Sequence, residues 1–138
     1  MNNILFSKGN DNWRTPTLLY QKYMNLGYFD PCPYNSDFDG LSIKWKELNY
    51  VNPPFSKIEK FIDKAIKEHQ NGNMIVLLIP ARTDTKYFRK LVDYGCDITF
   101  ITGRLKYNDI GSAPFPSCLI SITNKKTTCT WINRNELI

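Results

Sequence analysis

The sequence predicts an α/β fold built on a mostly parallel open sheet with an antiparallel edge hairpin. The continuous apolar run from Met74 to Ile79 is typical of a strand that is buried on both faces. Predicted strands and helices alternate through the middle of the chain, as they do around a parallel sheet. The last two predicted strands, Ser117–Ile122 and Thr127–Ile132, lie too close in sequence for a crossover helix, so we expect an antiparallel pair at one edge.

Each element is predicted from local signals. A helix begins after Thr15-Pro16, because threonine caps helices and proline suits the first helical position. The apolar stripe that follows Ser56 predicts an amphipathic helix, and Gly95 ends another. The expected elements are, in order, a helix from Thr15 to Gly27, strands at 28–29 and 48–51, a helix from 56 to 71, a strand at 74–79, a helix at 85–94, and strands at 97–101, 117–122 and 127–132.

Length and charge limit the classes of function. The 138 residues suit one domain, 1–138, with no separate target-recognition domain. Lys and Arg number 18 against 13 Asp and Glu, and the net charge of +5 favours a polyanionic partner such as nucleic acid. The lysines of the helix after Ser56 are expected to form a solvated face instead of a DNA track.

Several classes are disfavoured. None of the four cysteines has C-x-x-C spacing and His69 is the only histidine, so no metal site is expected. The chain has no apolar segment of signal-peptide length and none near the roughly 20 residues that span a bilayer. We therefore expect a cytoplasmic protein with reduced thiols and no membrane partner.

Polar segments follow four of the predicted strands. They are Asp30-Pro31-Cys32, Asn52-Pro53-Pro54-Phe55, Pro80-Ala81-Arg82 and Gly103-Arg104. Ligands of open α/β sheets bind beyond the carboxyl ends of the strands. We therefore expect these four segments to converge on one crevice.

The segment Asn52-Pro53-Pro54-Phe55 carries the most chemistry. The prolines end the strand and offer carbonyl groups without competing N–H groups, so the Asn52 amide oxygen and the Pro53 carbonyl can face the same small volume. Two acceptors suit a planar primary amine such as that of adenine, and would aim its lone pair at an electrophile. Phe55 would stack on the ring that carries the amine. Taken alone, the segment also fits an ordinary strand-ending turn.

With its neighbours, this segment resembles the phage-type DNA N6-adenine methyltransferases (the phage Dam family). The matching segments, in order, are Trp13–Pro16 (W-x-T-P), Phe29–Cys32, Asp39–Leu41 with Trp45, Asn52–Phe55, Leu78–Thr85, Gly103–Tyr107 and Ala113–Ser117. The resemblance implies a reduced Rossmann-like, S-adenosylmethionine-dependent methyltransferase fold, because the interval from Asp30 to Asn52 leaves little room for two further strands. It implies methyl transfer to the N6 amine of a flipped adenine in double-stranded DNA.

The resemblance also implies roles for individual residues. Those implied to hold the target amine and base are Asn52, Pro53, Pro54 and Phe55. Those implied to bind the cofactor are Trp13, Thr15, Pro16, Asp30, Pro31, Cys32 and Asp39. Candidates for DNA contact are Arg82, Arg104, Lys106 and Tyr107. Any sequence recognition would fall to short loops near the crevice, so we expect low specificity or help from a second copy in a homodimer.

Three alternatives remain open. The loop after Asp30 has no glycine before Gly40, unlike that of larger methyltransferases, which keeps alive a catalytically silent nucleic-acid-binding module. The same amine clamp could serve RNA or cytosine N4, although Asn at position 52 favours adenine. Pro31-Cys32 could instead hold a nucleophilic thiolate, but the other motifs of cytosine-C5 methyltransferases are missing.

Overall fold

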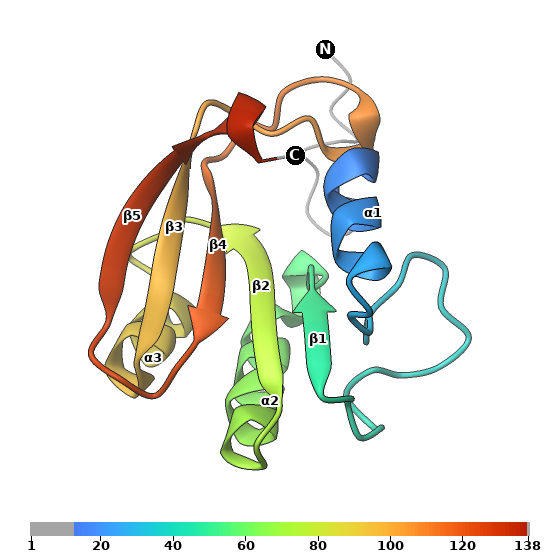
Figure 1. Cartoon of the computed structure of the whole chain (residues 1–138), viewed down its shortest axis with the longest axis vertical. Helices are drawn as coiled ribbons and strands as arrows, with labels where there is room; N and C mark the ends of the chain where they lie inside the picture. Colours follow the sequence, from blue (N-terminus) through green and yellow to red (C-terminus); the bar gives the residue numbers. More distant parts are fainter. Residues whose placement is uncertain (1–12, 138) are drawn as a thin grey trace.

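The computed structural model describes residues 13–137, which form a mixed sheet flanked by helices (Figure 1). Its elements are α1 (Thr17–Asn25), β1 (Leu48–Val51), α2 (Ile58–Gln70), β2 (Met74–Pro80), α3 (Lys86–Tyr94), β3 (Cys96–Thr102), β4 (Ser117–Ile122) and β5 (Thr128–Asn133), with short 3-10 turns at Phe55–Lys57, Tyr107–Asp109 and Arg134–Glu136. The predicted α/β class is confirmed, and every predicted helix and strand except the one at 28–29 is confirmed within one or two residues. The expected strand at 28–29 is a single bridge, in which Phe29 pairs with Asn49.

The sheet order in the described chain is β1-β2-β4-β3-β5. β1 pairs with β2, and β3 with β5, in parallel, whereas β4 is antiparallel to both of its neighbours. The expected edge hairpin of β4 and β5 is therefore wrong, because β3 lies between them. The reason is burial: β4 carries Cys118, Ile120 and Ile122, which are buried, so it occupies the sheet interior, whereas the polar side chains of β5 suit an edge.

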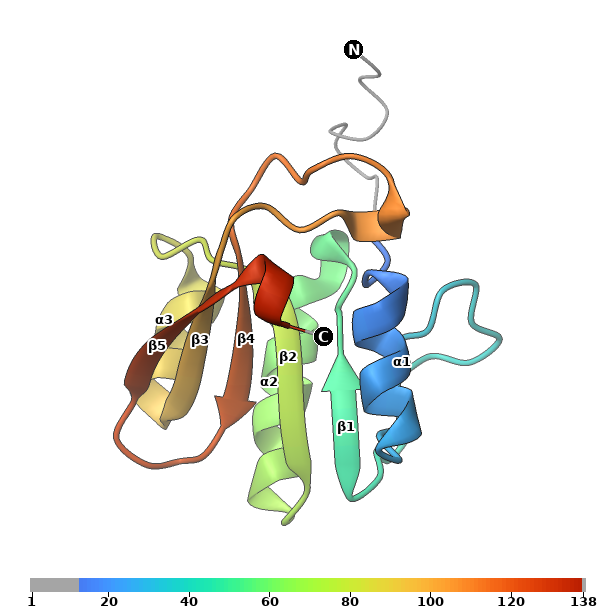
Figure 2. The same ribbon diagram turned by 45° about the horizontal axis from the view of Figure 1, so that its top comes forward.

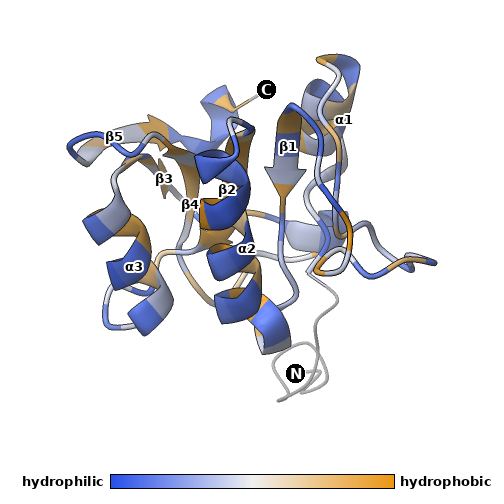
Figure 3. Ribbon diagram, turned by 90° about the horizontal axis from the view of Figure 1, so that it is seen from below, coloured by the Kyte–Doolittle hydropathy of each residue, from blue (hydrophilic) through white to orange (hydrophobic). Residues whose placement is uncertain are grey.

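Helices cover both faces of the sheet. α2 and α3 lie on one face and turn hydrophilic residues outward (Figure 3). Their apolar residues, including Ile62 and Leu91, pack with Leu77 and Ile120 of the sheet. α1 packs on the opposite face, where Leu19 meets another buried cluster that includes Leu78. The two faces of β2 thus belong to two cores, as expected for a strand without polar side chains.

The described part of the chain has two long irregular segments, residues 30–47 before β1 and residues 103–116 between β3 and β4. The segment between Asp30 and Leu48 contains no strand, as expected for a reduced sheet. The segment between β3 and β4 arches toward the start of α1 (Figure 2). There the Asn108 N–H donates to the carbonyl oxygen of Arg14 at 3.0 Å, and Thr17 donates to the Asp109 carboxylate. These contacts join the start of α1 to the loop between β3 and β4.

Candidate active site

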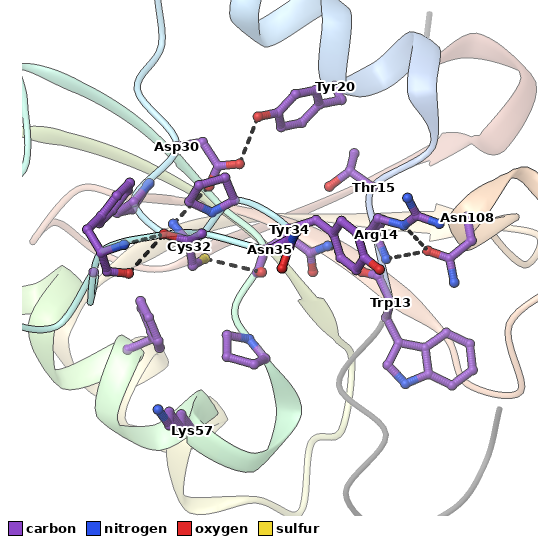
Figure 4. Close-up of a pocket in the computed structure, with 18 of the residues that line it drawn as sticks. Trp13, Arg14, Thr15, Tyr20, Asp30, Cys32, Tyr34, Asn35, Lys57 and Asn108 are labelled. Carbon is purple, nitrogen blue, oxygen red and sulfur yellow. Dashed lines mark hydrogen bonds between the residues drawn. The ribbon is translucent and has the colours of Figure 1, made fainter. Parts of the chain in front are cut away.

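A cavity of about 1140 Å³ opens beyond the carboxyl end of β1 (Figure 4). Eight residues singled out from the sequence line it, namely Trp13, Thr15, Asp30, Pro31, Cys32, Asp39, Asn52 and Pro54, whereas Pro16, Pro53 and Phe55 are not among its lining residues. The segments that begin at Asp30 and Asn52 therefore meet, as the strand-end rule predicts. Arg82 comes close only through Phe55, and Gly103-Arg104 does not line the cavity. The volume suits a small-molecule ligand of cofactor size.

Asp30 is a half-buried carboxylate at the floor of this cavity. Its Oδ2 accepts a hydrogen bond from the Tyr20 hydroxyl at 2.9 Å, and its Oδ1 accepts one from the Cys32 N–H at 2.9 Å. Burial raises the pKa of Asp30 above its ordinary value of 3.8, while these two hydrogen bonds lower it. The carboxylate is thus held in place at an energetic cost, which is typical of functional sites.

Cys32 links the two strand-end segments. Its Sγ donates to the backbone carbonyl oxygen of Asn52 at 3.3 Å. Burial raises the pKa of the Cys32 thiol well above its ordinary value, and the negative charge of Asp30 raises it further. The side chain is therefore a neutral thiol at pH 7, which argues against a nucleophilic role because the thiolate is the reactive form.

Asn52 follows β1 directly and has a fixed orientation. Its Nδ2 donates to the backbone carbonyl oxygen of Trp13 at 2.5 Å. A carbonyl oxygen can only accept, so this bond identifies the amide nitrogen and leaves Oδ1 as the acceptor end. Among the described residues no hydrogen bond to Asn52 Oδ1 is formed. The side chain thus presents one oriented acceptor at the cavity.

The loop after Asp30 reaches its closest approach at Gly40. A Cβ atom on Gly40 would lie 1.9 Å from the carbonyl oxygen of Pro31, so only glycine fits there. The Trp45 indole N–H donates to the Gly40 carbonyl oxygen at 2.8 Å and anchors the loop from inside. The glycine-poor loop of the sequence therefore has its close backbone approach at Gly40, ten residues after Asp30.

Asp39 uses its carboxylate to shape the same loop. Oδ1 accepts from the Leu41 N–H at 3.0 Å and Oδ2 from the Ser42 hydroxyl at 2.8 Å. These hydrogen bonds lower the pKa of Asp39. The side chain is exposed and keeps further lone pairs toward the cavity, so it can serve the loop and a ligand together.

Among the cavity residues that were not predicted from the sequence, Tyr20, Arg14 and Asn108 make contacts that organise the site. Tyr20 orients Asp30, as described above. Arg14 donates to Asn108 Oδ1 from its backbone N–H at 2.7 Å and from Nε at 3.3 Å, and its guanidinium carbon lies 4.3 Å from the Tyr34 ring centroid. Asn108 has a positive φ of 59°, a conformation that asparagine adopts more readily than most residues. The contact between Arg14 and Asn108 spans 94 positions, so no periodic pattern in the sequence could have revealed it. Tyr20 could have been noticed, because it lies one helical turn after the predicted cofactor residue Pro16.

An aromatic cluster lies beside the cavity and contains Phe55. The ring of Trp13 lies nearly parallel to that of Phe55, at 17° and 6.0 Å between centroids. Phe115 meets both rings edge-on, at 5.3 Å from Trp13 and 5.2 Å from Phe55. The guanidinium carbon of the exposed Arg82 lies 5.7 Å from the Phe55 centroid and 5.6 Å from that of Phe115. The cluster therefore combines flat apolar surfaces with a cation, as sites for nucleic-acid bases do.

The remaining candidates for DNA contact divide into two groups. Arg104 and Lys106 are exposed, and Arg104 makes a long contact of 3.5 Å with the Ala113 carbonyl oxygen. Tyr107, by contrast, is only 2 % exposed, and its hydroxyl shares a 2.9 Å hydrogen bond with Ser117. The expectation of a DNA contact at Tyr107 is therefore corrected: the side chain is part of the core beneath the aromatic cluster.

Residues 13–137 contain neither a membrane-spanning helix nor a cluster of metal-ligating side chains. No helix among residues 13–137 is long and apolar enough to cross a membrane. No group of three or more His, Cys, Asp or Glu side chains in that range could hold a metal ion.

One family model matches nearly the whole chain, and two individual proteins show partial similarity to it. The sequence model of the family described as DNA N-6-adenine-methyltransferase (Dam) matches residues 3–134. A DNA N-6-adenine-methyltransferase of Escherichia phage T1 is 30% identical over 74 residues, which are 52% of this chain and 31% of the phage protein, so the match spans about a third of that relative. The crystal structure of a predicted O-methyltransferase from Agrobacterium tumefaciens aligns with a TM-score of 0.43 and 14% identity, over 87% of this chain and 64% of the other.

Proposed function

The chain belongs to the DNA N-6-adenine-methyltransferase (Dam) family, and from this premise we propose that it transfers a methyl group from S-adenosylmethionine to the N6 amine of adenine in double-stranded DNA. Such a reaction needs three things: a pocket for the cofactor, acceptors that hold the amine, and a surface that binds DNA with the base turned out of the helix. Residues that fit each need lie close together at the carboxyl end of β1.

The observation that carries the proposal is the orientation of Asn52. Because its Nδ2 is committed to the Trp13 carbonyl oxygen, Oδ1 is the atom available to accept a hydrogen from a primary amine. We assign the second acceptor to the carbonyl oxygen of Pro53, whose ring removes any competing N–H. Two acceptors on the amine favour a pyramidal nitrogen and direct its lone pair, and fixed acceptors need no rearrangement during the reaction.

The cavity suits the proposed cofactor in size and in chemistry. Asp30 and Asp39 offer carboxylate oxygens to hydroxyl and amine donors, and Arg14 offers a cation to a carboxylate. Thr15, Pro16, Pro31 and Cys32 complete the proposed contacts, together with the backbone of Trp13. S-adenosylmethionine, when bound, supplies an electrophilic methyl group. The residues of this chain hold the amine and exclude water, so positioning provides most of the rate enhancement.

DNA would approach from the side of Phe55 and Arg82. Phe55 offers a flat face to the flipped adenine, and the cation of Arg82, packed against Phe55 and Phe115, suits the phosphate beside that nucleotide. Arg104 and Lys106 extend the exposed positive charge along the neighbouring loop. Since a related protein is encoded by a phage, we place the reaction in the cytoplasm of a bacterial host.

The test is Asn52→Ala, with Asn71→Ala at the exposed C-terminal end of α2 as the matched control. DNA is treated with purified protein and labelled cofactor, and its nucleosides are separated. The wild type and Asn71→Ala should form N6-methyladenine, and Asn52→Ala should lose at least about 100-fold in rate with cofactor binding largely intact.

Other outcomes of the same assay separate the alternatives. Labelled N4-methylcytosine, or label found only in RNA, would replace adenine in DNA as the target. Calorimetry without any S-adenosylmethionine binding would favour the silent nucleic-acid-binding module. Unchanged adenine methylation by Asn52→Ala would contradict the proposed clamp.

A further inference from the structure

We propose that the indole of Trp13 forms the second wall of the target-base site, opposite Phe55, and that it keeps this site closed until adenine enters. The proposal rests on the function proposed above. It gives Trp13 a substrate-binding role in place of the cofactor-side role that the sequence resemblance implies.

The rings of Trp13 and Phe55 are nearly parallel but lie closer together than a base between them requires. Trp13 and Phe55 are nearly parallel, at 17°, with centroids 6.0 Å apart. Stacked aromatic carbons lie about 3.5 Å apart, so a base between two rings needs walls separated by about 7 Å. Because the ring planes cannot lie farther apart than the centroids, the slot between the two rings is preformed in orientation but too narrow for a base by at least about 1 Å. A flipped base would have to displace the indole to enter.

Neighbouring aromatic rings hold the Trp13 indole in place. Phe115 meets Trp13 at 85° and Tyr107 meets it at 85°, so two edge-on rings set the plane of the indole. Tyr107 is itself buried and anchored to Ser117, which gives this support a rigid base. Edge-to-face packing of this kind fixes the direction of a flat side chain. The indole is therefore held parallel to Phe55 by groups that lie outside the slot.

A displacement of the Trp13 ring need not disturb the hydrogen bond that orients Asn52. The Trp13 carbonyl oxygen accepts from Asn52, and the N–H of the next residue, Arg14, donates to Asn108. These two bonds hold the peptide group between Trp13 and Arg14, so a displacement of the ring about its side-chain torsions leaves the carbonyl oxygen in place. The acceptor orientation of Asn52 is thereby kept while the slot widens.

The Trp13 side chain points away from the proposed cofactor residues. Figure 4 shows the Trp13 indole pointing away from Asp30 and Cys32, and its ring packs with Phe55 and Phe115. The same residue thus orients Asn52 through its backbone and faces Phe55 through its ring. Both contacts lie on the target side of the site.

The experiment uses Trp13→Leu and Trp13→Phe, with Trp131→Leu on the exposed edge strand β5 as the matched control. Losing a base stack of this kind should lower kcat/KM for DNA by about 5- to 150-fold in Trp13→Leu, with cofactor affinity unchanged. Trp13→Phe keeps a flat ring and should retain most of the activity. Trp131→Leu should behave as the wild type.

A fluorescence readout separates base stacking from a merely structural role. DNA carries 2-aminopurine in place of the target adenine, and its emission is quenched while the base is stacked. Its emission in the complex should be clearly higher with Trp13→Leu than with the wild type, because one stacking surface is gone. Equal emission and equal kcat/KM for DNA would overturn the proposal, as would a loss confined to cofactor affinity.

Two further arms keep the result decisive. If Trp13→Leu does not fold, the double variant Trp45→Phe/Trp131→Phe leaves Trp13 as the single tryptophan, whose emission should be quenched by DNA containing the target adenine. Unchanged emission on DNA with an abasic site and on DNA with adenine alike would overturn the proposal. Absence of methylation by the wild-type protein would instead overturn the proposed function, so the two failures are distinguishable.

Discussion

The side-chain amide of Asn52 donates a hydrogen bond to the backbone carbonyl oxygen of Trp13, with the two atoms 2.5 Å apart and the residues 39 positions apart in the chain. This bond joins the segment before α1 to the end of β1. It also selects one of the two amide orientations, because only the nitrogen can donate. The side chain that we propose accepts a hydrogen bond from the substrate amine is thereby oriented before the substrate arrives.

This geometry predicts that Asn52→Asp is not a conservative change. An ionised carboxylate cannot donate to the Trp13 carbonyl oxygen and is repelled by it, so kcat at pH 7.5 should fall by about 100-fold. A protonated carboxyl group can donate to Trp13 and still accept through its other oxygen. The ratio of variant to wild-type kcat should therefore rise as the pH falls toward 5, as measured in buffers of constant ionic strength.

Because the comparison uses the ratio of variant to wild-type kcat, the pH dependence of ionisable groups that both proteins share cancels out. A ratio that is flat with pH, together with a wild-type rate at pH 7.5, would contradict the role of the Asn52–Trp13 hydrogen bond. The thermal midpoints of both proteins, measured across the same pH range, report any loss of folding separately.

Gly40→Ala should disrupt the loop of residues 30–47, which borders the proposed cofactor cavity. A Cβ at position 40 would lie 1.9 Å from the Pro31 carbonyl oxygen and 2.9 Å from its carbonyl carbon, so backbone must move. We expect a lower thermal midpoint and weaker binding of S-adenosylmethionine by calorimetry. The matched control is Gly111→Ala, where nothing lies within 4 Å of the added atom. Equal effects of the two substitutions would show that the close approach at Gly40 is unimportant.

Local structure was largely predictable because turn residues, capping residues and hydrophobic periodicity are local properties of the sequence. β1 and β4 have the predicted bounds, since each is a short apolar run that ends beside proline or polar residues. The strand order was not predicted, because loop length limits direction but not which strand lies in the interior. The contrast between SCLISI in β4 and TCTWIN in β5 was the available signal for an interior and an edge strand.

The site was predictable where it depends on strand ends and not where it depends on tertiary contacts. Asp30, Cys32 and Asn52 meet at one cavity because the parallel bridge at Phe29 and the strand β1 end side by side there. The contact of Arg14 with Asn108 joins segments far apart in the chain, so no sequence spacing could indicate it. Tyr107 follows a strand in a polar segment, which suggested exposure, but its hydroxyl has a buried partner in Ser117.

Asp30→Asn should change stability and cofactor binding in opposite directions at neutral pH. Burial raises the pKa of Asp30 above 3.8, so the folded state binds this proton more readily than the unfolded state. The corresponding stabilisation is full below about pH 4 and is lost as the pH rises through the folded-state pKa. Asparagine has no charge to bury, so the free energy of unfolding of Asp30→Asn, relative to wild type, should increase with pH.

Urea unfolding at pH 4.5 and pH 7 measures this difference, and calorimetry measures the expected loss of cofactor affinity. A stability difference that stays constant or decreases between the two pH values would contradict the buried, pKa-raised carboxylate. Retained cofactor affinity would remove Asp30 from the proposed binding set while leaving the stability prediction intact.

Arg82→Gln should weaken DNA binding in a way that depends on salt. The Arg82 guanidinium is exposed and packs over Phe55 and Phe115, where it can meet one phosphate. Removing one phosphate contact should make the slope of log Kobs against log salt less negative by about 0.9. Lys67→Gln, on the exposed face of α2, is the control of equal charge change and should leave the slope unaltered. Arg82→Lys should keep the slope but lower affinity, because an ammonium group stacks poorly on aromatic rings. Equal slopes for Arg82→Gln and Lys67→Gln would place the phosphate contact elsewhere, with Arg104 and Lys106 as the next residues to substitute.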